Sequence, residues 1–497
     1  ASTTGTVAAP TVKRTALSVA QLSNSWVVGT KNMAVTPIRQ FYYARQTGNW
    51  NDNNTWSYTD GGASCGCQPT NDGYVVISSG YTVTVNTTAV TDFVEIKNGA
   101  NLVDNGSKGL TVNYNMVTLG TGKFSNTYTW SINGSLVLSA ASVTNIGSPL
   151  AISGTLNLSA GSVLNLNSGT LTLNGDVILN GTISLAGGSL ALNSVGGNII
   201  GTGVVNGSAG ETINVTNAKV ISNGSSIVIG NATNSLNLAL GAGVTVTNNG
   251  ALTLYGNLVG GSAASTWVNG PNSTINISGT LLATGVLNTI TGANTVRYIG
   301  AAQSIKVPNV SYNTLEIAGT GTKVLTATVD VDNTLTIKRG AILNAGTYAI
   351  TGTGGLTMEE NSEYLMQRSA AGVYPELAGN YNLAYGTITI NQTANVTTLA
   401  SAIYNNVKLT GTQPCDLSGV EVINGSLMIQ NGASVINNGP MFIDGELVFS
   451  STAVSELASD IVVGGINITA GGLNDGARTI TINNGSWLNN GGVTTLT

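Results

Sequence analysis

The chain has 497 residues, and only 8% of them are charged, against about 25% in an ordinary soluble protein. Glycine supplies 65 residues and proline only 9, which fits neither collagen nor a Pro-rich disordered chain. The net charge of −5 argues against nucleic acid as a partner, and no apolar run is long enough for a transmembrane helix. Without any histidine, the sequence excludes a Ser–His–Asp triad and histidine metal sites.

Residues 1–40 are more polar and irregular than the rest. We expect them to form an N-terminal arm, either a cap for the fold or a strand added to a neighbouring subunit. Within the arm, Ser18–Trp26 is a candidate short helix or part of the cap. The chain begins at Ala1, which fits an exported protein that has lost its signal peptide, and also fits a fragment of a longer chain.

Residues 41–115 are richer in aromatic residues and turns, and they predict a β region with the first turns of the main fold. Trp50 and Trp56 are candidates for stacking on sugar rings. A buried tryptophan also seals the end of a core, and we favour this capping role for both.

Three cysteines are present, Cys65 and Cys67 in "SCGCQP" and Cys415 in "QPCDL". They are too few for a metal site without histidine. A disulfide between Cys65 and Cys67 would close a very tight ring, and one to Cys415 requires the fold to bring distant segments together. The pairing therefore stays open at this point.

From residue 116 onward the chain repeats one sequence pattern, which is clearest between Ile152 and Asn193. Short apolar pairs alternate with Asn, Ser and Thr, as expected for strands with one buried face. Glycines beside Ser, Asn or Ala separate the pairs and suit sharp corners. The pairs are Leu156 and Leu158, Leu164 and Leu166, Leu171 and Leu173, Ile183 and Leu185, and Leu190 and Leu192.

Strands this short suit either antiparallel hairpins or a parallel solenoid. Hairpins usually have longer strands, so we favour an all-β fold, an elongated parallel β-helix with about three strands in each turn of roughly 20 residues. We expect it to be right-handed and to span residues 116–497 with a loop excursion at 358–386. Roughly 20 turns, each one strand spacing thick, predict a rod about 100 Å long.

Parallel β-helices also include enzymes that act on polysaccharides, so the carboxylates need attention. Asp330 and Asp332 in "DVD" alternate onto one strand face, and Lys338 and Arg339 follow within the same expected turn. A pair of carboxylates can hydrolyse a glycosidic bond when the spacing is right. The alternative, which we favour, is an outward polar row with charge pairing between neighbouring turns, because an exposed pair has no means of shifting a pKa.

The excursion at 358–386 carries five charges and Pro375. Its glutamates, Glu359, Glu360 and Glu363, are a possible cation site, although a solvated loop face is the simpler interpretation. Its tyrosines form the best candidate recognition surface on compositional grounds. They are Tyr364, Tyr374, Tyr381 and Tyr385.

Two segments resemble modules of large cell-surface proteins of Bacteroidota. One is "FYYARQTGNWNDNNTWS" (41–57) followed by "CGCQPTNDGYVVISSGYTVTV" (65–85), and the other spans Asn294–Ile337. The resemblance implies export, commonly by the type IX secretion system, and a role in adhesion or as a structural fibre. Such proteins usually end in a sorting domain, whereas this sequence stops in mid-pattern at "SWLNNGGVTTLT". The resemblance supplies no catalytic residues.

Two hypotheses of different kinds follow. The first is a non-catalytic structural or adhesive protein of the cell surface, without cofactor or metal, that associates with itself through the rod ends. Glycans or other surface proteins are further possible partners. The second is a carbohydrate-active β-helix enzyme or a glycan-binding module, which clustering of Asp330 and Asp332 with other acids in a groove would favour.

Overall fold

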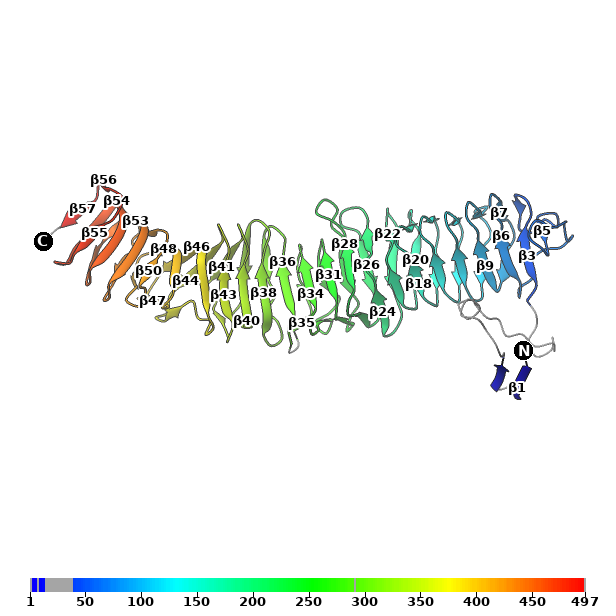
Figure 1. Cartoon of the computed structure of the whole chain (residues 1–497), viewed down its shortest axis with the longest axis horizontal. Coiled ribbons are helices and arrows are strands. Elements are labelled where there is room, and N and C mark those ends of the chain that lie inside the picture. Colours follow the sequence, from blue (N-terminus) through cyan, green and yellow to red (C-terminus); the bar gives the residue numbers. More distant parts are fainter. Residues whose placement is uncertain (1, 7–8, 14–38, 290–291, 496–497) are drawn as a thin grey trace.

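The structure is a computed structural model that describes residues 2–6, 9–13, 39–289 and 292–495. Residues 39–289 and 292–495 form an all-β rod of about 21 turns in which parallel strands are stacked about 20 residues apart (Figure 1). The predicted parallel β-solenoid is therefore confirmed. The candidate helix Ser18–Trp26 lies outside the described residues. None of the described residues belongs to a helix long and apolar enough to cross a bilayer.

In the first part of the rod each turn contributes one strand to each of three sheets. Sheet 1 contains β3 (Phe41–Ala44), β5 (Trp56–Ser57), β6 (Tyr74–Ile77), β9 (Phe93–Ile96), β12 (Met116–Thr118), β15 (Leu136–Leu138), β18 (Leu156–Leu158), β21 (Val177–Leu179), β24 (Gly197–Ile200), β27 (Lys219–Ile221), β30 (Thr245–Asn248), β33 (Thr266–Asn269) and β35 (Val286–Thr289).

The other two sheets follow the same order along the rod. Sheet 2 begins with β4 (Gly48–Asn49), β7 (Thr82–Val85), β10 (Asn101–Asp104), β13 (Lys123–Asn126), β16 (Val143–Ile146), β19 (Val163–Asn165), β22 (Thr182–Ser184), β25 (Val204–Asn206), β28 (Ser226–Ile229), β31 (Ala251–Leu254), β34 (Thr274–Ile277) and β36 (Thr295–Tyr298). Sheet 3 contains β8 (Ala89–Thr91), β11 (Leu110–Val112), β14 (Trp130–Ile132), β17 (Leu150–Ile152), β20 (Thr170–Leu173), β23 (Ser189–Leu192), β26 (Thr212–Val215), β29 (Asn237–Leu240) and β32 (Leu258–Gly260).

Beyond β36 the cross-section changes, because sheet 3 ends at β32. Sheet 2 continues through β38 (Tyr312–Ile317), β40 (Val329–Ile337) and β43 (Gly355–Met358), and β42 (Ile350–Thr351) also pairs with β40. A fourth sheet contains β37 (Gln303–Ile305), β39 (Thr322–Leu325), β41 (Ile342–Gly346), β44 (Glu363–Arg368), β46 (Tyr381–Gln392), β48 (Ile403–Gly411), β50 (Val422–Ile423), β51 (Leu427–Asn431), β53 (Met441–Glu456), β54 (Ile461–Asn474), β55 (Ile480–Ile482), β56 (Trp487–Asn489) and β57 (Val493–Thr495).

Two small sheets complete the fold. One contains β45 (Val373–Tyr374), β47 (Thr397–Leu399), β49 (Pro414–Asp416) and β52 (Ser434–Ile436). The other is an antiparallel pair in the N-terminal arm, β1 (Ser2–Thr6) and β2 (Ala9–Lys13). Residues 358–386, expected as one loop, in fact include β44 and the start of β46, so the chain leaves the two main sheets only between Arg368 and Tyr381.

The core consists of rows of apolar side chains that run along the rod. Leu136, Leu156 and Val177 are register partners on successive strands of sheet 1, and all three are buried. All ten residues of the predicted apolar pairs between Leu156 and Leu192 are buried in the same way. Burying one such side chain contributes roughly 1.5–3 kcal/mol relative to an exposed one, so each turn is stabilised chiefly by its inward residues.

Glycines serve the corners in two different ways. Gly187 has a φ of +86°, which a residue with a side chain adopts only under strain. Gly154 has an ordinary φ but packs against the preceding turn, and a Cβ built there would lie 2.6 Å from the carbonyl carbon of Gly134. The second role is set by the spacing of the turns rather than by the bend itself.

The close packing at Gly154 leads to a stability prediction. Gly154→Ala forces two turns apart and is expected to destabilise the rod by about 1–3 kcal/mol, seen as a lower midpoint of urea unfolding by circular dichroism. Gly419→Ala is the matched control, because its Cβ would come no nearer than 3.8 Å to any neighbour. Equal midpoints for the two variants would contradict this account of the corner.

Candidate functional site

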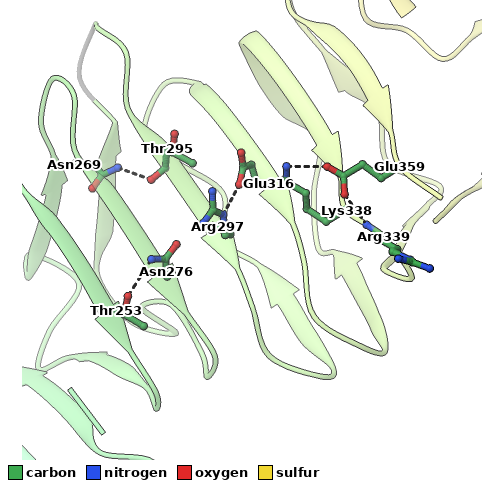
Figure 2. Close-up of polar contacts among 9 residues, drawn as sticks. All are labelled: Thr253, Asn269, Asn276, Thr295, Arg297, Glu316, Lys338, Arg339 and Glu359. Carbon is green, nitrogen blue, oxygen red and sulfur yellow. Dashed lines mark hydrogen bonds and ion pairs between the residues drawn. The ribbon is translucent and has the colours of Figure 1, made fainter. Parts of the chain in front are cut away.

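The outer face of sheet 2 carries a row of polar side chains on successive turns. Its members are Thr253, Asn276, Arg297 and Glu316. Asn276 donates a hydrogen bond to the Thr253 hydroxyl at 3.0 Å, and Arg297 forms an ion pair with Glu316 (Figure 2). The outward residues therefore link neighbouring turns as the inward ones do, through partly buried polar contacts.

Buried asparagines perform the same task at the inner corners. Asn248 donates to the side-chain oxygen of Asn269 at 3.0 Å. Asn269 donates to the Thr295 carbonyl at 3.0 Å (Figure 2). The Asn269 amide thus joins the last residue of β33 to the first residue of β36, across the corner between sheets 1 and 2. This explains why so polar a residue recurs next to the core.

Further along the rod, four charged residues of two neighbouring turns form what we call the turn charge group: Lys338, Arg339, Glu359 and Glu360. Lys338 donates to Glu359 at 2.9 Å, the backbone amide of Arg339 donates to the same carboxylate at 3.0 Å, and the Arg339 side chain pairs with Glu360 at 3.4 Å. Figure 2 shows the first two contacts. The Lys338 hydrogen bond lowers the pKa of Glu359. Two positive and two negative charges leave the group neutral.

Asp330 and Asp332 lie on the same exposed face of β40, with buried Val331 between them. Asp330 accepts a hydrogen bond from the Thr351 hydroxyl on the following turn. Asp332 accepts one from Ser311 on the preceding turn. Each carboxylate is thus tied to a different neighbour, and the structure shows no contact that joins either of them to Lys338 or Arg339.

The three glutamates proposed as a cation site separate in the structure. Glu359 and Glu360 are paired with cationic side chains, whereas Glu363 accepts a hydrogen bond from Thr389 at 2.6 Å. Over the described ranges, no group of three His, Cys, Asp or Glu residues is placed to hold a metal ion. Their oxygens serve contacts between turns instead.

The four candidate recognition tyrosines occupy different environments. Tyr364 and Tyr374 are buried, with exposed fractions of 1% and 6%, so they form no surface. Tyr381 is half-buried and donates to the Pro375 carbonyl at 2.8 Å. Tyr385 is 54% exposed. The sequence showed the cluster but not the strand alternation that turns most of its rings inward.

A buried ion pair near Tyr374 was missed by the sequence analysis. Arg368 pairs with Glu376 at 3.0 Å, donates to the Tyr348 carbonyl at 2.7 Å, and places its guanidinium 4.6 Å from the centre of the Tyr374 ring. Burial raises the pKa of Glu376, and the Arg368 charge offsets part of that rise. The pair fixes the segment between β44 and β46 against the rod.

The two tryptophans lie at the N-terminal end of the rod and are both buried. Their ring centroids are 5.4 Å apart, and the Trp56 indole donates to the Trp50 carbonyl at 2.8 Å. Beside them, β5 pairs antiparallel with β3, at the end of sheet 1 (Figure 1). Neither ring is available to stack on a sugar.

An aromatic row on the outer face of sheet 1 was also not foreseen. Phe41, Tyr74, Phe93 and Tyr114 stack with centroids 4.7, 5.3 and 5.2 Å apart. The Arg39 guanidinium lies 4.7 Å from the last two rings. The rings face one another along the rod, so mainly their edges reach solvent, and the row joins turns rather than offering flat faces to a ligand.

Two lysines are buried in the core without a carboxylate partner. Lys219 is 3% exposed and donates to carbonyls that include Ser194, and its stem lines an apolar cavity in the wider turns of the rod. Lys323 is 0% exposed and donates to the Thr320 carbonyl at 2.9 Å. Burial lowers the pKa of each to about 8.

Cys65 and Cys67 form a disulfide in the loop after β5, and Cys415 is a free thiol in the core. Burial raises the pKa of Cys415 to about 12, so it is unreactive at neutral pH. Since the disulfide closes a ring within one loop, it links no two turns of the rod.

Comparison with protein-family models, with curated proteins and with solved structures finds no match for this chain.

The buried lysines predict an unusual pH dependence. Their pKa is about 8 in the folded chain against an ordinary 10.5, so the unfolded chain binds more protons between these values and stability rises with pH across that window. Replacing Lys323 by Met removes one buried amine and is expected to raise stability at pH 7 by about 2 kcal/mol, with a smaller gain at pH 9.5.

Urea unfolding midpoints at the two pH values measure this difference. Exposed Lys108 provides the control, and Lys108→Met should shift the midpoint little at either pH. A Lys323→Met gain that is the same at pH 7 and pH 9.5 would mean that the amine is not the source of the effect.

The buried ion pair predicts a second stability difference. Glu376→Ala leaves the Arg368 charge buried without its partner and is expected to destabilise the protein by about 3 kcal/mol. Glu360→Ala removes only the exposed partner of Arg339 and should cost less than about 1 kcal/mol. Thermal unfolding of both variants tests this, and a milder effect at Glu376 than at Glu360 would refute the proposed anchoring.

Proposed function

We propose that this protein is a non-catalytic structural or adhesive protein of the cell exterior, in which the solenoid serves as a rigid rod. The observation that carries the proposal is the continuity of the core. A single apolar cluster extends from Tyr42 to Leu473, so the described turns behave as one stacked body rather than as separate globules. Length and stiffness are what such a body supplies.

The outer surface supports the same conclusion. Several of its charged residues pair between neighbouring turns, as in Arg297 with Glu316 and Lys338 with Glu359. The enzyme alternative rests on Asp330 and Asp332, which share a face but are each held by a hydroxyl of a different turn. Both carboxylates are exposed on β40.

Export is supported by two observations. The disulfide between Cys65 and Cys67 is typical of oxidising compartments. The two segments that resemble surface proteins of Bacteroidota point to the cell surface and to the type IX secretion system. Polar faces of Ser, Thr and Asn with few charges suit a rod that stands in water.

Association through the rod ends is part of the proposal, and the two ends differ. At the N-terminal end, β5 runs antiparallel beside β3. At the other end, β55, β56 and β57 each pair with β54, and no further strand of the described residues pairs with them. A contact between unlike ends is heterologous and builds an open fibre with a direction.

Electron microscopy and sedimentation of the purified protein test the proposal. We expect rods about 100 Å long, from about 21 turns at one strand spacing each, that join end to end as concentration rises. Leu488→Glu, on the exposed side of β56, should suppress the joining, and Val195→Glu on the side of the rod should not.

Each result has a distinct meaning. Rods that stay single at all concentrations would remove the fibre and keep the rod. Compact particles would overturn the structural role. Release of new reducing ends from a polysaccharide, abolished by Asp330→Asn, would favour the enzyme instead.

A further inference from the structure

Tyr385 is placed on the surface by an irregularity in β46. Leu383 pairs with Tyr404 and Thr387 with Asn406, so β46 has two more residues than β48 over the same span. The extra residues form a bulge at Gly386, whose φ is +81°. Bulges reorient side chains that a regular strand would keep in the alternating pattern, and they are frequent beside binding sites.

The Tyr385 side chain borders a surface depression of about 270 Å³. The other residues that line it are Arg339, Glu359 and Glu360, three members of the turn charge group. These residues come from three successive turns, namely the corners after β40 and β43 and the bulge in β46. The rod thus brings one aromatic ring and several strong hydrogen-bonding groups together in one hollow.

The polar side chains around the Tyr385 ring differ in how many of their hydrogen-bonding atoms are already paired. Glu359 is held by Lys338 and by the backbone amide of Arg339. The Arg339 and Glu360 side chains are 73% and 56% exposed and are joined by one contact of 3.4 Å. Most of the guanidinium donors and carboxylate lone pairs therefore face solvent and remain available to a ligand.

Charge selects the class of ligand. The turn charge group is neutral as a whole, so it favours neither an anion nor a cation. A pyranose ring offers one face of C–H groups that can pack on tyrosine, with hydroxyls at its rim that donate to a carboxylate and accept from a guanidinium. We propose that Tyr385, Arg339 and Glu360 form a binding site for an uncharged hexopyranose unit of a glycan.

The aromatic row on sheet 1 does not offer this geometry. In the row from Phe41 to Tyr114 each ring face is covered by the next ring. Tyr385 stacks on no other ring in the part of the chain that the structure describes. The site adds recognition to the rod and does not depend on whether the rods join into fibres.

Affinity electrophoresis through gels that contain a polysaccharide tests the site. The probes are the neutral polysaccharides dextran, mannan and hydroxyethylcellulose, with alginate as the anionic comparison. We expect at least one neutral polysaccharide to retard the wild-type protein. Tyr385→Ala should weaken this retardation at least tenfold, and Glu360→Gln severalfold. Tyr348→Ala is the matched control, because this exposed tyrosine does not line the depression and should bind as wild type.

Unchanged thermal unfolding and rod length would show that Tyr385→Ala still folds, so that any loss of binding is local. The proposal is overturned if no neutral polysaccharide retards the wild type, if Tyr385→Ala binds as well as wild type, or if alginate alone is retained. A failure of the rod in electron microscopy would count against the proposed structural function and leave this binding result to stand by itself.

Discussion

Hydrogen bonds between the strands of neighbouring turns are the constraint on which the rest of this structure depends. They fix the register, and the register then places like residues above one another: Leu136, Leu156 and Val177 inside, Thr253 and Asn276 outside. Each row gains from its repetition, since an apolar residue packs on the next and an amide finds the next amide. The same spacing leaves no room for a side chain at Gly154.

The same stacking of turns decides which polar side chains on the outer surface are paired with a neighbouring turn. A carboxylate on a regular strand finds a partner one turn away, as Glu316 finds Arg297, and is thereby used up in holding the rod together. The bulge in β46 interrupts the regular pattern and leaves the Tyr385 side chain exposed. In a solenoid of this kind, departures from regularity are places to look for recognition, because bulges reorient side chains.

The sequence predicted the features that depend on local periodicity. The apolar pairs from Leu156 to Leu192 and the parallel stacking follow from alternation and glycine spacing alone. It did not predict the aromatic row from Phe41 to Tyr114, because that row depends on which residues become register partners across turns. Nor did it predict that Lys323 points inward or that Arg368 meets Glu376, because both depend on the path of the chain at a corner or an excursion.

The disulfide between Cys65 and Cys67 joins two positions of one loop, so no covalent bond fastens one turn of the shaft to the next. A tensile load applied along the shaft would act parallel to the inter-turn hydrogen bonds and peel turns off singly. Each detached turn of about 20 residues would release roughly 70 Å of extended chain for the loss of about 5 Å of shaft. Under such a load, the molecule would extend as turns detach, long before the chain itself broke.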